Sequence, residues 1–100
     1  MDKLLLIDDE ADVQYSFRRI FDAPDLQLFT ASSGEEGVQL IQRVKPDLVI
    51  SDIRMAGING LETLRRIRAI DPRLPVILMT AYGTTQTAIE AMKLGAYDYL

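Results

Sequence analysis

The sequence predicts an α/β domain built on a parallel sheet with helices on both faces. Three runs of strand length, Leu4–Ile7, Leu48–Ser51 and Val76–Met79, are apolar at nearly every position instead of at alternate positions. Such runs are typical of strands covered on both faces. Helical patterns separate the runs, and this alternation implies right-handed crossovers and a doubly wound sheet.

Two further stretches complete the predicted sheet. Residues 26–31 and 96–100 mix apolar and polar side chains, as expected of strands that are less completely covered. We therefore place the three apolar runs inside the sheet and these two strands at its edges.

Four amphipathic helices are expected between the strands, each followed by a residue that stops or turns the chain. Ser33 with Glu36, and Asn59 with Glu62, have the spacing of a capping box before the second and third helices. The expected buried faces are Val13, Phe17, Ile20 and Phe21; Val38, Ile41 and Val44; Leu61, Leu64 and Ile67; and Ala88, Ala91 and Met92. Pro24, Pro46 and Pro72 follow the first three helices, and Gly95 is a natural left-handed cap for the fourth. Because the face of the fourth helix is the smallest, we expect this helix to be the least firmly anchored.

Composition excludes several classes of function. The chain has 100 residues, the length of a single domain, and a net charge of −4. It has no His, which excludes a phosphohistidine of its own, a Ser-His-Asp triad and a His-ligated zinc site. With no cluster of basic residues, direct binding of duplex nucleic acid is not expected. The absence of Cys fits a reducing compartment, and no apolar run reaches the ~20 residues of a membrane span, so we expect a cytoplasmic protein.

Acidic residues follow two of the central strands. The first strand is followed directly by Asp8, Asp9 and Glu10. Asp52 follows the strand at 48–51, and Thr80 follows the strand at 76–79. The carboxyl ends of parallel strands meet at one edge of the sheet, so these side chains should lie close together. Packed carboxylates repel each other unless a cation relieves them, and Mg²⁺ prefers such oxygen ligands. We therefore expect a magnesium site suited to phosphoryl chemistry.

Each residue also has a simpler interpretation. Asp8 and Asp9 could be helix N-caps, Asp52 a turn residue and Thr80 an ordinary strand end. Their joint occurrence at the ends of three core strands favours the functional interpretation.

The chain resembles the receiver domain of two-component response regulators from Lys3 to Leu100. The ordered motifs are Leu-Ile-Asp-Asp-Glu at 6–10, Asp-Leu-Val-Ile-Ser-Asp-Ile-Arg-Met at 47–55, Asn-Gly-Leu-Glu at 59–62, Pro-Val-Ile-Leu-Met-Thr-Ala at 75–81 and Lys-Leu-Gly-Ala-Tyr-Asp-Tyr-Leu at 93–100. The stretch from Thr-Ala-Tyr-Gly at 80–83 to Asp-Tyr-Leu at 98–100 looks most like receivers of the nitrogen-regulatory class, which precede sigma-54 activator ATPase and DNA-binding domains. The resemblance implies a flavodoxin-like five-stranded sheet of order 2-1-3-4-5, with four of the usual five helices.

The resemblance also implies a role for each site residue. Asp52 would accept a phosphoryl group from a sensor histidine kinase. Mg²⁺ would be held by Asp9, Asp52 and the backbone carbonyl of Arg54, with Asp8 acting through water. Thr80 and the Ala81 amide would bind the phosphoryl group, and Tyr99 would be the aromatic switch. The bulk of Arg54 and Tyr82 would slow dephosphorylation. An output domain in a longer protein, or a homodimer, would receive the signal.

The sequence departs from the family pattern in two places. Ala56 stands where the family usually has Pro, and the chain ends before the family's phosphate-pairing Lys-Pro and fifth helix. Lys3, Lys45 and Lys93 all map away from the site, so we interpret residues 1–100 as a C-terminally truncated receiver. A pseudo-receiver that is not phosphorylated is the alternative. A magnesium-dependent phosphatase is disfavoured, because Arg54 occupies the position of the general acid it would need.

Overall fold

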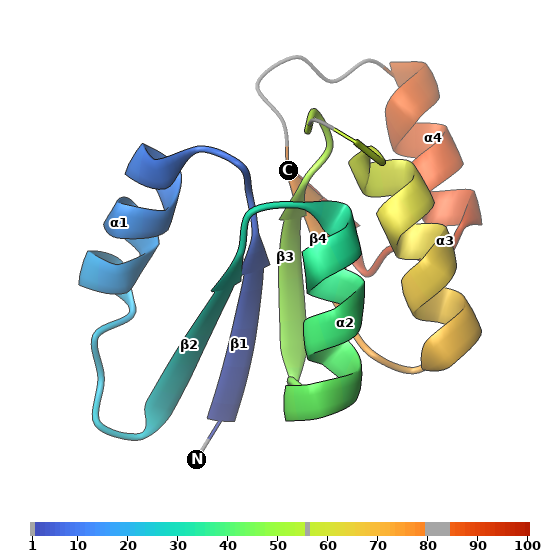
Figure 1. The fold of residues 1–100 in the computed structure, drawn as a ribbon. Coiled ribbons are helices and arrows are strands. Elements are labelled where there is room, and N and C mark those ends of the chain that lie inside the picture. The colour runs from blue at the N-terminus through green and yellow to red at the C-terminus, as the bar shows by residue number, and fades with distance from the viewer. Residues whose placement is uncertain (1, 56, 80–84) are drawn as a thin grey trace.

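A computed structural model describes residues 2–55, 57–79 and 85–100 and confirms the predicted alternation of strands and helices (Figure 1). The elements are β1 Asp2–Ile7, α1 Ala11–Ile20, β2 Leu26–Ala31, α2 Gly34–Val44, β3 Leu48–Asp52, α3 Gly60–Ile70, β4 Val76–Met79, α4 Thr85–Lys93 and β5 Asp98–Tyr99. None of the helices within these ranges is long and apolar enough to cross a membrane.

The five strands form one parallel sheet in the order β2-β1-β3-β4-β5, as the resemblance implied. The three apolar runs are the central strands, and β5 contributes only two residues to one edge. Ile7 pairs with Ser51, and Asp52 pairs with Met79. This register brings the ends of β1, β3 and β4 to one edge of the sheet.

The main core lies between the sheet and helices α2 and α3. Leu5, Val49 and Leu78 from the central strands are fully buried there, together with Leu64 and Ile67 of α3. Leu4 and Leu6 alternate with these positions along β1, so they point to the opposite face. They are also buried, which explains why the run Leu4–Ile7 is apolar at every position.

Three of the predicted helix ends are confirmed. The Ser33 side chain accepts a hydrogen bond from the Glu36 amide at 3.1 Å, and the Asn59 side chain accepts one from the Glu62 amide at 2.9 Å. Gly95 has a φ of 95°, and the Ala96 amide donates to the Ala91 carbonyl at 3.0 Å. These features form the left-handed cap expected after α4.

The expectation that α4 is the least anchored helix is wrong with respect to burial. Helix α4 buries Ala91, whereas none of the ten residues of α1 is buried. Ile20, predicted to lie on the buried face of α1, is 71% exposed. The reason is visible in Figure 1, where α1 lies apart from the group formed by α2, α3 and α4.

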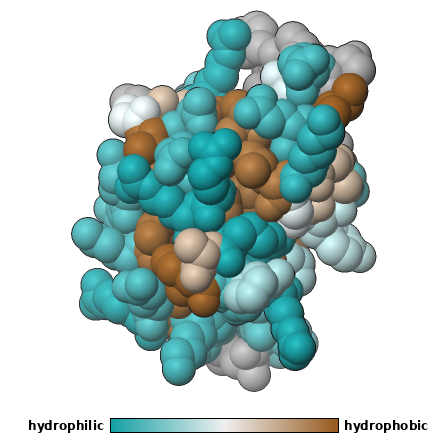
Figure 2. Space-filling view, turned by 90° about the vertical axis from the view of Figure 1, so that its right-hand side faces the viewer, coloured by the Kyte–Doolittle hydropathy of each residue, from teal (hydrophilic) through white to brown (hydrophobic). Residues whose placement is uncertain are grey.

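The opposite side of the molecule, where α3 and α4 lie, has apolar patches among hydrophilic side chains (Figure 2). Helix α4 contributes two exposed apolar residues, Ile89 and Met92. Small residues on its inner face anchor α4, while its large apolar residues face solvent.

Candidate metal and phosphoacceptor site

Three aspartates meet at the edge of the sheet where β1 and β3 end. Asp8, Asp9 and Asp52 each offer a carboxylate oxygen, and these atoms all lie within 4.8 Å of one another. Asp8 is buried, Asp52 is half-buried and Asp9 is exposed. The pairing of β1 with β3 therefore brings together residues that are far apart in the sequence.

Asp8 is held by hydrogen bonds at its amide, its carbonyl and its side chain. Its amide donates to the Ala31 carbonyl at 3.0 Å, and its Oδ1 accepts from the Glu10 amide at 2.9 Å. Its carbonyl accepts from Gln14 Nε2 at 2.8 Å. The simpler interpretation, in which Asp8 or Asp9 caps the helix, does not hold, because the N-cap of α1 is Glu10, without a side-chain cap bond.

Asp52 is placed by the close packing of α3 on the end of β3. The Gly60 amide donates to the Ile53 carbonyl at 2.8 Å. A Cβ atom at Gly60 would lie only 2.5 Å from the Asp52 carbonyl oxygen and 2.7 Å from Ile53 Cα. Only glycine lets the helix start this close to the backbone that carries Asp52.

The electrostatics of the cluster favour a bound cation. Burial raises the pKa of Asp8 above its usual value, and the negative charges of Asp52, Glu10 and Asp9 raise it further, while the hydrogen bond from the Glu10 amide opposes them. A divalent cation would remove this repulsion. All three donors are carboxylate oxygens at short separation, which is the ligand type that Mg²⁺ prefers, so the residues present fit this ion.

The other predicted site residues are only partly described. Arg54 is exposed in the segment after β3. Tyr99 pairs through its backbone with Leu78, but the placement of its side chain is not described. Thr80, Ala81 and Tyr82 lie outside the described residues, as does Ala56. The roles of these residues stay predictions.

Two residues that the sequence did not single out lie next to the cluster. Gln14 of α1 reaches the Asp8 carbonyl, and the same Nε2 donates to Ser32 Oγ at 3.2 Å. The hydrophobic pattern shows only that Gln14 lies on a helix beside apolar neighbours. Nothing in the pattern indicates a contact across two loops.

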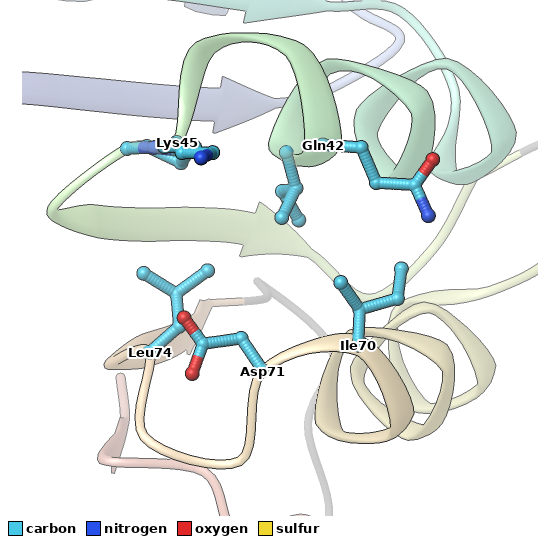
Figure 3. Close-up of a pocket in the computed structure, with 7 residues that line it drawn as sticks. Gln42, Lys45, Ile70, Asp71 and Leu74 are labelled. Carbon is cyan, nitrogen blue, oxygen red and sulfur yellow. The ribbon is translucent and has the colours of Figure 1, made fainter.

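A cavity of about 360 Å³ lies at the opposite end of the sheet, between the C-terminal ends of α2 and α3. Figure 3 shows its walls, which are formed by Ile41, Gln42, Lys45, Pro46, Ile70, Asp71 and Leu74. Lys45 thus lies away from the aspartates, as predicted, and so does Lys3, whose Nζ donates to the Val44 carbonyl at 3.1 Å. Most of the lining is apolar, and its few polar groups do not form a ligand set comparable to the aspartates.

The fold and site define a class of protein: a doubly wound α/β domain with a cluster of carboxylates at the carboxyl ends of its central strands. Residues 4–100 match the family described as the response regulator receiver domain. The chain belongs to this family.

Relatives and solved structures agree with this assignment. The chain is 36% identical over 100 residues to the regulatory protein AtoC of Escherichia coli, covering all of this chain and 22% of AtoC. It is 37% identical over 95 residues to the DNA-binding transcriptional regulator NtrC of Klebsiella pneumoniae, covering 95% of this chain and 20% of NtrC. The chain therefore spans about a fifth of the length of these relatives. A CheX-CheY-BeF3-Mg²⁺ complex from Borrelia burgdorferi contains a similar fold, with a TM-score of 0.92 and 26% identity over 99% of this chain and 76% of that one.

Proposed function

We propose that this receiver accepts a phosphoryl group on Asp52 from a phosphohistidine of a sensor histidine kinase, with Mg²⁺ bound at Asp8, Asp9 and Asp52. The observation that carries the proposal is the convergence of the three carboxylates within 4.8 Å. Such a cluster gives a nucleophilic oxygen and cation ligands in one place, and phosphoryl transfer depends mostly on positioning and charge neutralisation.

In the proposed reaction, an Asp52 carboxylate oxygen attacks the phosphorus atom of the phosphohistidine. A bond forms between that oxygen and phosphorus, and the bond from phosphorus to the imidazole nitrogen breaks. The imidazole nitrogen keeps the electron pair and takes up a proton from water. Mg²⁺ would supply positive charge beside the transferred group, which reduces its repulsion from the aspartates.

The other ligands follow from the family pattern. The Arg54 carbonyl would complete the protein ligands of Mg²⁺, Asp8 would act through water, and Thr80 with the Ala81 amide would bind the new phosphoryl group. The Borrelia complex, whose fold is similar, contains BeF3 and Mg²⁺, which supports a magnesium site in this chain without assigning its ligands.

The signal would pass to an output domain or to a second receiver. Phosphorylation adds charge and acceptor oxygens, and movement of Thr80 and Tyr99 would shift a two-state equilibrium of the surface around α4 and β5. AtoC and NtrC are regulators about five times the length of this chain. Their length supports an attached output domain, and that domain, not the receiver, would bind DNA.

A small phosphoryl donor tests the proposal directly. Acetyl phosphate with Mg²⁺ should add one phosphoryl group to the chain, detected by intact mass, and Asp52→Asn should abolish the addition. Asp22→Asn, which changes an exposed aspartate outside the cluster, serves as the control and should leave it unchanged. An unmodified wild-type chain under these conditions would contradict the proposal and favour an interaction module with an idle site.

The rate of dephosphorylation is a second test. We expect Tyr82→Gly to lose its phosphoryl group faster than the wild type, because a smaller side chain would open the path of the attacking water. A phosphoryl lifetime no shorter than that of the wild type would refute the role given to Tyr82.

A further inference from the structure

Helix α1 is attached to the sheet by few contacts, and one of them reaches the acidic cluster. None of its residues is buried. Two of its side chains donate hydrogen bonds to other elements: Gln14 to the Asp8 carbonyl and Ser32 Oγ, and Arg18 to Thr30 Oγ1 at 2.9 Å. These polar contacts therefore make a large contribution to how α1 is held.

Gln14 contacts the cluster through the backbone, at the carbonyl of Asp8. The carbonyl that accepts at 2.8 Å belongs to the peptide that joins Asp8 to Asp9. Holding that oxygen fixes the plane of the peptide. This plane determines the directions in which the Asp8 and Asp9 side chains leave the backbone. The Glu10 amide donates to the side chain of Asp8, whereas Gln14 acts on the backbone that Asp8 and Asp9 share.

The same amide nitrogen also joins the loop after β2. Ser32 accepts from it at 3.2 Å, and the Ser32 amide donates to Glu36 Oε1 at 3.0 Å, which ties this loop to the first turn of α2. A half-buried side chain of α1 thus links the loops that follow β1 and β2.

We propose that Gln14 is a positioning residue that couples cation binding at Asp8 and Asp9 to the anchoring of helix α1; this inference rests on the proposed magnesium site. Gln14 pre-arranges the Asp8–Asp9 peptide for the cation. Because coupling between two events is reciprocal, the cation in turn strengthens the attachment of α1. The site and the helix then respond to each other although no α1 side chain is a ligand.

The affinity for Mg²⁺ is the first measurement. Gln14→Leu keeps a similar volume and removes the donor without adding charge. One lost hydrogen bond should weaken Mg²⁺ binding about two- to ten-fold, measured by isothermal titration calorimetry of the 100-residue chain. Gln14→Ala removes the same donor and should give a loss in the same range.

Hydrogen exchange of residues 11–20 separates coupling from a merely structural contact. In the wild type, saturating Mg²⁺ should slow exchange of these amides. In Gln14→Leu the exchange should be faster and should no longer respond to Mg²⁺. A contact that only holds the helix would speed exchange equally with and without the ion.

Thr30→Val is the matched control. It removes the acceptor of Arg18, so it deletes a second polar contact that α1 makes within the described residues, without changing charge. Its Mg²⁺ affinity should stay within two-fold of the wild type, and the effect of Mg²⁺ on exchange should persist. The inference is overturned if Gln14→Leu binds Mg²⁺ like the wild type or keeps the effect on exchange. Failure of the wild type itself to bind Mg²⁺ would instead overturn the proposed function.

Discussion

Asp8 combines burial with neighbouring negative charge. The residue is 2% exposed and its carboxyl group lies beside those of Asp9 and Asp52, and both burial and the neighbouring charges raise its pKa. Because the folded state raises the pKa, it holds a proton more tightly than the unfolded chain does. The stability contributed by Asp8 is therefore complete below its usual pKa of 3.8 and is lost as the pH rises through the folded-state value.

Asp8→Asn should therefore stabilise the metal-free domain at neutral pH. Asparagine keeps an oxygen that can accept from the Glu10 amide but carries no charge. We expect a gain on the order of 1 kcal/mol, the scale of one like-charge contact at about 4 Å in a highly polar medium. Urea denaturation with a chelator at pH 7 measures it. The gain should shrink below pH 3.8, and an equal gain at all pH values would contradict this account.

Gly60 is the residue whose replacement should most directly disturb Asp52. In Gly60→Ala the new methyl group meets backbone atoms of Asp52 and Ile53, which cannot move aside as a side chain can. We expect a loss of roughly 1–3 kcal/mol in the free energy of unfolding. Gln39→Ala, on an exposed position of α2, should change it by less than about 0.5 kcal/mol. A Gly60→Ala domain as stable as the wild type would mean that the close packing is not required.

Among the elements, α3 and the segment after α4 are joined by one side chain, Arg68. Its Nη2 and Nε donate to the Gly95 carbonyl at 2.7 and 3.1 Å, and its Nη1 donates to the Leu74 carbonyl at 2.6 Å. The guanidinium group thus satisfies carbonyls of the α3–β4 loop and of the turn that ends α4.

Removing this group should loosen the end of α4. For Arg68→Ala we expect a loss of about 1–3 kcal/mol, because bonds from a charged donor are stronger than neutral ones. Faster hydrogen exchange at residues 94–97 would locate the effect. Arg65 of the same helix forms only an exposed pair with Glu62, so Arg65→Ala should cost less than about 1 kcal/mol. Equal losses for the two variants would refute the special role of Arg68.

Element positions followed from the sequence, whereas contacts across elements did not. The capping pairs at Ser33 and Asn59 are local, so their spacing alone predicted them correctly. The exposure of Ile20 depends on whether another helix lies beside α1, which no local pattern records. The long-range bonds of Gln14 and Arg68 likewise depend on loops that meet only in the folded chain.

For the molecule as a whole, cation binding should appear as added stability. A ligand that binds only the folded state at ten times its dissociation constant adds about 1.4 kcal/mol. For a domain of this size, that gain raises the melting temperature by roughly 5–10 °C. Differential scanning calorimetry with and without Mg²⁺ measures the shift, and Asp52→Asn should reduce it. An identical shift in Asp52→Asn would show that the ion binds elsewhere.

The convergence of the three aspartates was predictable because it depends on the topology of the sheet. Once β1 and β3 are neighbouring parallel strands, Asp8 and Asp52 must share an edge. The solvent exposure of each aspartate was not predictable, since it depends on how the loops fold over this edge of the sheet. Asp8 is buried and Asp9 is exposed although they are adjacent in the sequence.

Because β1 pairs directly with β3, the first 52 residues of the chain contain the whole aspartate cluster. All three aspartates are already in the nascent chain when residue 52 has been added, before β4, α4 and β5 have been translated. The three aspartates of the cluster thus emerge from the ribosome before β4 and β5, the strands that carry or precede the residues proposed to report phosphorylation.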